Sequence, residues 1–161
     1  KNAIIRVEIT DEIPTINSQK RRYTVNLYRQ KWYKLLHMSS PTPLVAIRCI
    51  TYNQAAYIRQ CLDGFVMQRT DFAFVAIVHD DCSTDGTDDI VREYAQRYPH
   101  IIKPIFETEN QYSKGDGSLS RIMTQACNNT GAKYIAMCEG DDYWTDPLKL
   151  QKSGLFIHEY N

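Results

Sequence analysis

The sequence predicts an α/β domain in which helices cover both faces of a doubly wound, mostly parallel β-sheet. From Pro43 onward, short apolar runs alternate with longer segments whose apolar residues recur at helical spacing. Right-handed crossovers join strands that alternate with such helices, and they make neighbouring strands parallel. With 161 residues, 43% of them hydrophobic, the chain is long enough for one such domain and too short for two.

Four short apolar runs are the predicted strands, since runs of this length are typical of buried strands. They span residues 44–50, 72–78, 101–106 and 134–138. The chain from residue 43 to residue 161 is therefore the predicted domain, and residues 1–42 are an N-terminal extension.

Three stretches between these runs carry apolar residues at helical spacing. Their apolar positions are Ile58, Cys61, Leu62 and Phe65; Ile90, Val91, Tyr94 and Ala95; and Leu119, Ile122, Met123, Ala126 and Cys127. Asn53 is placed to cap the first helix, and Gly131 to end the third. Asp146 followed by Pro147 predicts the start of a last helix.

Charge and cysteine content narrow the class of protein. The formal net charge is zero, so we expect no nucleic-acid partner, which would call for a basic excess. The five cysteines show no metal-binding or disulfide pattern and are interpreted as reduced thiols of a cytoplasmic protein. Basic and aromatic residues interleave in the N-terminal extension, which predicts either a peripheral membrane or partner contact at the inner membrane face, or a stripe packed on the domain.

Ligands of doubly wound sheets bind at the carboxyl ends of the strands, so the loops there are the candidate site. Three loops follow predicted strands directly, and they span residues 51–53, 80–87 and 139–144. Several of their carboxylates converge on one edge of the sheet, where they need a cation or hydrogen-bond donors.

Five acidic residues in or near these loops fall into two groups. Asp80, Asp85 and Asp146 are interpreted as helix caps. Asp141 and Asp142 do not stand immediately before a helix, so capping is less available to them. A site whose ligands are all oxygen atoms selects a hard cation, so the sequence predicts Mg²⁺ or Mn²⁺.

The order of these motifs resembles family-2 glycosyltransferases of the glycosyltransferase-A fold. The matching residues are Thr51-Tyr52-Asn53, Asp80-Asp81, Ser83-Thr84-Asp85, Thr87, Tyr94, Asn110, Glu139, Asp141-Asp142, Pro147 and Lys149-Leu150. The resemblance runs from Pro43 to the end of the chain, and the ordered set is far more specific than any single motif. The run 138–147 is especially similar to bacterial enzymes that build surface polysaccharides.

The resemblance implies a nucleotide-sugar site in the first half of such an enzyme. Tyr52 would flank the nucleobase, Asp81 would accept a hydrogen bond from it, and Asp141 would lie near the ribose. Asp142 would bind the metal that bridges the diphosphate. Thr51, Asn53 and Arg121 complete the implied nucleotide-binding set, and Lys114 is a further candidate. The alternatives are core packing for Tyr52 and a solvated surface charge for Arg121 and Lys114.

The implied reaction is the transfer of a sugar from a nucleoside-diphosphate sugar, with a UDP-sugar as the expected donor, to a hydroxyl of a glycan or lipid-linked glycan, with inversion. The general base of the family follows the Asp-Asp motif at some distance, so we expect it beyond Asn161. One alternative is a donor-binding module without catalysis. A receiver domain and a sugar nucleotidyltransferase are disfavoured, because the loop after the first strand lacks their acidic pair and their Gly-rich motif.

Overall fold

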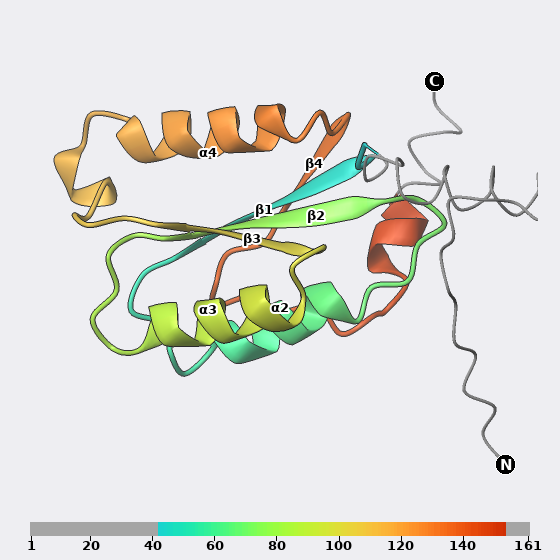
Figure 1. Cartoon of the computed structure of the whole chain (residues 1–161), viewed down its shortest axis with the longest axis horizontal. Helices are drawn as coiled ribbons and strands as arrows, with labels where there is room; N and C mark the ends of the chain where they lie inside the picture. Colours follow the sequence, from blue (N-terminus) through green and yellow to red (C-terminus); the bar gives the residue numbers. More distant parts are fainter. Residues whose placement is uncertain (1–41, 154–161) are drawn as a thin grey trace, which may run out of the picture. The chain divides into compact units, whose positions relative to one another are not determined.

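Four parallel strands form the sheet in the computed structural model, in the order β3-β2-β1-β4 (Figure 1). The strands are β1 (Val45–Thr51), β2 (Phe74–Asp80), β3 (Ile102–Phe106) and β4 (Tyr134–Met137). The structure describes residues 42–153, so the predicted extension lies outside the described residues except for Thr42. No helix within this range is long and apolar enough to cross a lipid bilayer.

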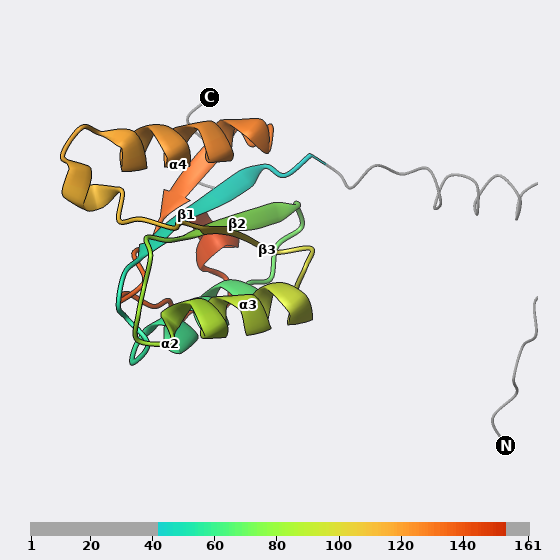
Figure 2. The same cartoon turned by 60° about the vertical axis from the view of Figure 1, so that its left-hand side comes forward.

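Helices cover both faces of the sheet, as the sequence predicts. Figures 1 and 2 show α2 (Ile58–Val66) and α3 (Thr87–Arg97) on one face and α4 (Ser118–Asn129) on the other. A short 3₁₀ helix, η1 (Tyr112–Lys114), precedes α4 and was not predicted. Residues 149–153 are helical, so the last predicted helix exists and begins two residues after Pro147.

The core lies in two layers because alternate residues of a strand point to opposite faces of a sheet. Ile47 and Cys49 of β1 pack with α2 and α3 in the larger layer. Ala46 points the other way and packs with Met123 and Cys127 of α4. The apolar pattern of each helix therefore matches the layer that it covers.

The predicted cap at Asn53 is wrong. Helix α2 begins after Tyr57, and no side chain caps it. The Oδ1 atom of Asn53 instead accepts a hydrogen bond from the backbone N–H of Thr84, at 2.8 Å. Asn53 also has a positive φ of 50°, a conformation that asparagine tolerates better than most residues. It therefore links the loop after β1 to the loop after β2.

Candidate functional site

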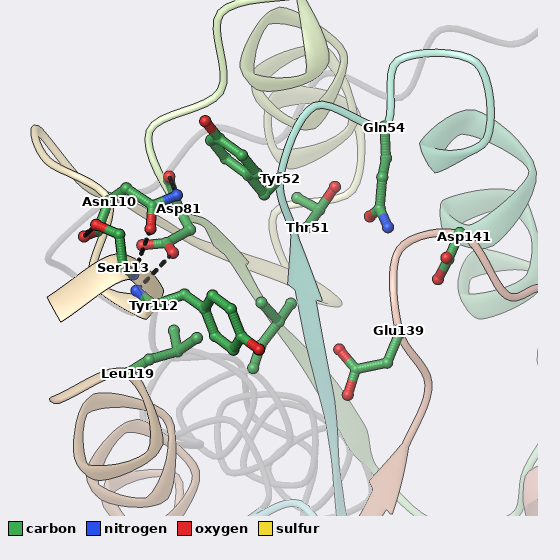
Figure 3. Close-up of a pocket in the computed structure, with 11 residues that line it drawn as sticks. Thr51, Tyr52, Gln54, Asp81, Asn110, Tyr112, Ser113, Leu119, Glu139 and Asp141 are labelled. Atoms are coloured by element: carbon green, nitrogen blue, oxygen red, sulfur yellow. Dashed lines mark hydrogen bonds between the residues drawn. The ribbon is translucent and has the colours of Figure 1, made fainter. Parts of the chain in front are cut away.

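An open cleft of about 700 Å³ lies at the carboxyl ends of the strands (Figure 3). Strands β2 and β3 lie on one side of β1, and β4 lies on the other, so the crossover direction changes between β1 and β4. Ligands of doubly wound sheets bind at such a switch point. The cleft is lined by Ile50, Thr51, Tyr52, Gln54, Asp81, Asn110, Tyr112, Ser113, Leu119, Glu139 and Asp141.

Asp81 is buried at the floor of the cleft and holds the turn that contains η1. Its Oδ1 accepts a hydrogen bond from the backbone N–H of Gln111, at 2.7 Å. Its Oδ2 accepts one from the backbone N–H of Tyr112, at 3.0 Å (Figure 3). Only 1% of Asp81 is exposed. Each carboxylate oxygen has two lone pairs, so acceptor capacity remains after these two bonds. Sequence reasoning missed this anchoring role, because the partners lie about 30 residues away in a loop.

The loop after β1 is fixed by a series of bonds to the loop after β2. Ser83 Oγ accepts a hydrogen bond from Asn53 N at 2.9 Å, and Thr87 Oγ1 accepts one from Gln54 N at 2.8 Å. Asp85 Oδ2 accepts a third, from Ala55 N, at 3.0 Å. These bonds hold the backbone that directly follows Tyr52, while Asn53 itself does not line the cleft.

Tyr52 and Thr51 both line the cleft, but in different ways. Tyr52 is 47% exposed, so the alternative that it packs in the core is wrong. Thr51 is almost completely buried, and its hydroxyl has no hydrogen-bond partner in the part of the chain that the structure describes. A buried hydroxyl without a partner carries a desolvation cost, which a bound polar group would relieve.

Gly140 lets the loop after β4 approach the end of β1 closely. A Cβ atom at this position would lie 2.8 Å from both Cβ and Oγ1 of Thr51, and it would also meet Oε1 of Gln54. The backbone N–H of Gly140 donates to the carbonyl oxygen of Ile50, at 2.9 Å. The glycine therefore brings Asp141 to the cleft.

Asp141 and Asp142 are both exposed, and Asp141 lines the cleft. The segment after them is anchored by Trp144, which is 9% exposed and packs edge-on against Phe65 with 5.2 Å between ring centroids. Within residues 42–153, no three His, Cys, Asp or Glu side chains are grouped so that they could hold a metal ion. A divalent cation here would need further oxygen ligands, and magnesium-type sites obtain these from substrate phosphates and water.

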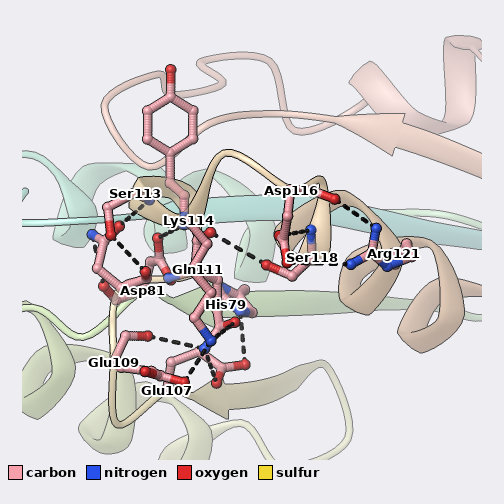
Figure 4. Close-up of polar contacts among 12 residues, drawn as sticks. His79, Asp81, Glu107, Glu109, Gln111, Ser113, Lys114, Asp116, Ser118 and Arg121 are labelled. Carbon is pink, nitrogen blue, oxygen red and sulfur yellow. Dashed lines mark hydrogen bonds and ion pairs between the residues drawn. The ribbon is translucent and has the colours of Figure 1, made fainter.

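The structure does not bring Arg121 or Lys114 into the cleft lining (Figure 4). The guanidinium of Arg121 donates to the backbone oxygen of Asp116 at 2.7 Å, and its side chain is 67% exposed. Lys114 Nζ donates to Glu109 and, at 2.9 Å, to Oε1 of Gln111. The hydrogen bond with Glu109 raises the pKa of Lys114. Both cations are paired with nearby residues of the segment between β3 and α4, which agrees with the surface-charge alternative.

The three carboxylates interpreted as caps bond to backbone N–H groups. Asp85 accepts from Thr87 N at 3.1 Å at the start of α3, and Asp146 accepts from Leu148 N at 2.9 Å. A hydrogen bond from the Thr87 hydroxyl lowers the pKa of Asp85. The N-cap residue of α3 is Gly86, so the capping interpretation is wrong for both Asp80 and Asp85. Asp80 instead accepts from Ser83 N at 3.0 Å and closes a turn.

A buried histidine on β2 supports the same turn that Asp81 holds. His79 is fully buried, and its Nε2 lies 3.2 Å from Oε1 of Glu107 (Figure 4). The other carboxylate oxygen of Glu107 accepts a hydrogen bond from Nε2 of Gln111, at 3.2 Å. The turn is therefore tied to the sheet through both the backbone and the side chain of Gln111.

We expect Cys82 to be the first thiol to react with a thiol reagent such as DTNB in the folded protein. The other four cysteines are buried, whereas Cys82 is partly exposed in the loop after β2. A hydrogen bond with the Cys61 thiol and burial both raise the pKa of Cys138, which disfavours the reactive thiolate. A Cys82→Ser variant should therefore lose the fast phase of labelling, and any fast-reacting thiol that remains in that variant would contradict the packing described.

Comparisons with known proteins agree with this geometry. Residues 47–153 match the family described as "Glycosyl transferase family 2". The chain is 42% identical over 116 residues to an uncharacterised protein of Mycobacterium tuberculosis, covering 72% of this chain and 32% of that protein. It is 30% identical over 122 residues to the putative teichuronic acid biosynthesis glycosyltransferase TuaG of Bacillus subtilis, covering 76% and 45%.

A solved structure shares the fold. The structure of S. aureus TarS 1-349 in complex with UDP-GlcNAc superposes with a TM-score of 0.58 at 28% identity, covering 71% of this chain and 31% of that one. The chain thus belongs to glycosyltransferase family 2 and has the glycosyltransferase-A fold. It spans about a third of the length of the mycobacterial relative.

Proposed function

We propose that this chain binds the nucleoside diphosphate of a nucleotide-sugar donor, as part of an inverting glycosyltransferase that acts in cell-surface polysaccharide synthesis. The proposal rests on one observation. Tyr52, Asp81 and Asp141 all line the same cleft at the switch point of the sheet. The bound UDP-GlcNAc of TarS supports a uridine nucleotide as the donor. The polysaccharide role of TuaG supports a glycan or lipid-linked glycan as the acceptor.

Each cleft residue has a chemistry that suits one part of the donor. The exposed ring of Tyr52 offers a flat apolar surface for a nucleobase. The remaining lone pairs of Asp81 can accept a hydrogen bond from a base that carries an imide hydrogen. Asp141 is suited to bind the ribose hydroxyls, and Thr51 adds a hydroxyl that lacks a described partner.

Asp142 is the residue that we assign to a divalent cation, Mn²⁺ or Mg²⁺. Its carboxylate is exposed and directly follows the cleft residue Asp141, and this position supports the assignment. When bound, such a cation neutralises charge on the leaving nucleoside diphosphate. The contribution of this chain is to hold that group in place, while the acceptor hydroxyl attacks from the opposite side of the sugar.

We expect UDP to raise the melting temperature of the chain in the presence of Mn²⁺, and Asp142→Asn to remove this shift. UDP at a hundred times its dissociation constant adds about 2.7 kcal/mol to the free energy of unfolding. For a domain of this size, that corresponds to a melting shift of roughly 5–10 °C. Differential scanning fluorimetry with UDP, with and without EDTA, measures the effect.

Asp71→Asn is the matched control for this experiment. Asp71 is an exposed aspartate that precedes β2, at the opposite end of the strands from the cleft, so its loss changes the net charge equally. This variant should keep the full UDP shift. A shift that survives both EDTA and Asp142→Asn would overturn the metal assignment, and no shift in the parent chain would overturn the proposed function.

A further inference from the structure

Tyr112 is an exposed aromatic residue held on a fixed backbone at the cleft. Its side chain is 78% exposed, although it lines the cleft together with Tyr52. Its backbone N–H donates to Asp81 Oδ2, and its carbonyl oxygen accepts from Gly115 N at 3.2 Å. Fixing a tyrosine ring costs little entropy, because only two side-chain torsions must be ordered.

Several hydrogen bonds besides those to Asp81 stabilise the turn around Tyr112. Asn110 Oδ1 accepts from Ser113 N at 2.7 Å, and Ser118 Oγ donates to the Gln111 carbonyl at 3.3 Å. These bonds add to the carboxylate of Asp81 and to the side-chain contact between Gln111 and Glu107. These bonds fix the backbone from which the Tyr112 side chain projects into the cleft lining.

The two cleft tyrosines lie on either side of Asp81, and the ring of Tyr112 extends from η1 toward β1 (Figure 3). A nucleobase has two flat faces, and Tyr52 can cover only one of them. Aromatic side chains stack on either face with little dependence on which base is bound. A ring opposite Tyr52 would cover the face that otherwise stays in water.

We propose that Tyr112 is a second aromatic wall of the nucleobase site, and that Asp81 positions it through the backbone of the turn. The proposal rests on the proposed function, because it needs a nucleotide in the cleft. Asp81 then has two roles, since one carboxylate both faces the base and fixes the ring that covers it. Tyr112 raises the affinity for the base and not for the diphosphate.

The test compares UDP with inorganic pyrophosphate, which lacks a base, by titration calorimetry on the full 161-residue chain in Mn²⁺. Tyr112→Ala should weaken UDP binding about 5- to 150-fold, the range for loss of one stacked base. Pyrophosphate binding should not change. Tyr112→Phe should keep most of the affinity for UDP, because the ring remains.

Tyr57→Ala is the matched control, since Tyr57 is 54% exposed and lies outside the cleft lining. It should bind both ligands like the parent chain. Equal UDP affinity of Tyr112→Ala and the parent would overturn the role of Tyr112 alone, and so would an equal loss for UDP and pyrophosphate. If Tyr112→Phe loses as much as Tyr112→Ala, the hydroxyl acts instead of the ring. A parent chain that binds neither ligand would refute the proposed function itself.

Discussion

Replacing Asp81 with alanine should lower the free energy of unfolding by about 3–5 kcal/mol, because one buried and one partly buried backbone N–H group lose a charged acceptor. Those groups belong to Gln111 and Tyr112, and no other side chain accepts from them in the described part of the chain. For a domain of this size, the melting temperature should fall by roughly 6–20 °C. Urea unfolding followed by circular dichroism measures the loss without any ligand.

Two further variants test whether the loss of stability comes from the hydrogen bonds of the Asp81 carboxylate or from the removal of a negative charge. Asp81→Asn keeps the shape but offers one acceptor oxygen and turns an NH₂ group toward the second N–H, so it should still lose about 1–3 kcal/mol. Asp89→Ala removes an exposed carboxylate in the first turn of α3 and should cost less than about 1 kcal/mol. An Asp81→Ala variant as stable as Asp89→Ala would refute the anchoring role.

Replacing Trp144 with alanine should cost about 3–5 kcal/mol, the usual range for a large aromatic residue removed from a core. Trp144 packs against Phe65, and Lys149 Nζ lies 5.0 Å from the centre of its ring. It also follows Asp141 and Asp142 by two to three positions, so its loss should release the segment that carries them. Metal-dependent binding of UDP should weaken together with stability.

The neighbouring Tyr143 provides the comparison for this variant. Tyr143 is 56% exposed, so Tyr143→Ala should change the free energy of unfolding by less than about 0.5 kcal/mol. Trp144→Phe keeps an aromatic ring beside Phe65 and should lose less than Trp144→Ala. If Trp144→Ala unfolds at the same urea concentration as Tyr143→Ala, the indole does not anchor the acidic loop.

Strands β1 and β2 could be predicted from the sequence because both faces of each strand are largely buried, which leaves a mostly apolar run. Their carboxyl ends could not be placed well. Strand β1 continues through Thr51, and β2 through His79 and Asp80, all of which are polar and almost completely buried. Polar residues at the end of an apolar run are usually a sign of a loop. Here they continue the pairing of β1 with β2, and the candidate site lies at these strand ends.

The position of the cleft was predictable, but the contacts that build it were not. The switch point follows from the alternation of strands and helices, and it brings Thr51, Asp81 and Asp141 to one edge. The partners of Asp81 lie in a loop that has no periodic pattern. Gly64 within α2 is a sequence clue to a close approach, since a Cβ there would lie 2.9 Å from Trp144 N, but nothing in the sequence names that partner.

The strand order also determines when the site can form as the chain is made. In the sheet, Val45 of β1 pairs with Phe74 on one side and with Tyr134 on the other. Ribosomes add roughly 5–20 residues per second, so the first pairing becomes available seconds before the second. During that interval the cleft lacks Glu139 and Asp141, which follow β4 in the chain. The donor contacts proposed for Asp141 and Asp142 can therefore form only in the last step, when β4 docks beside β1.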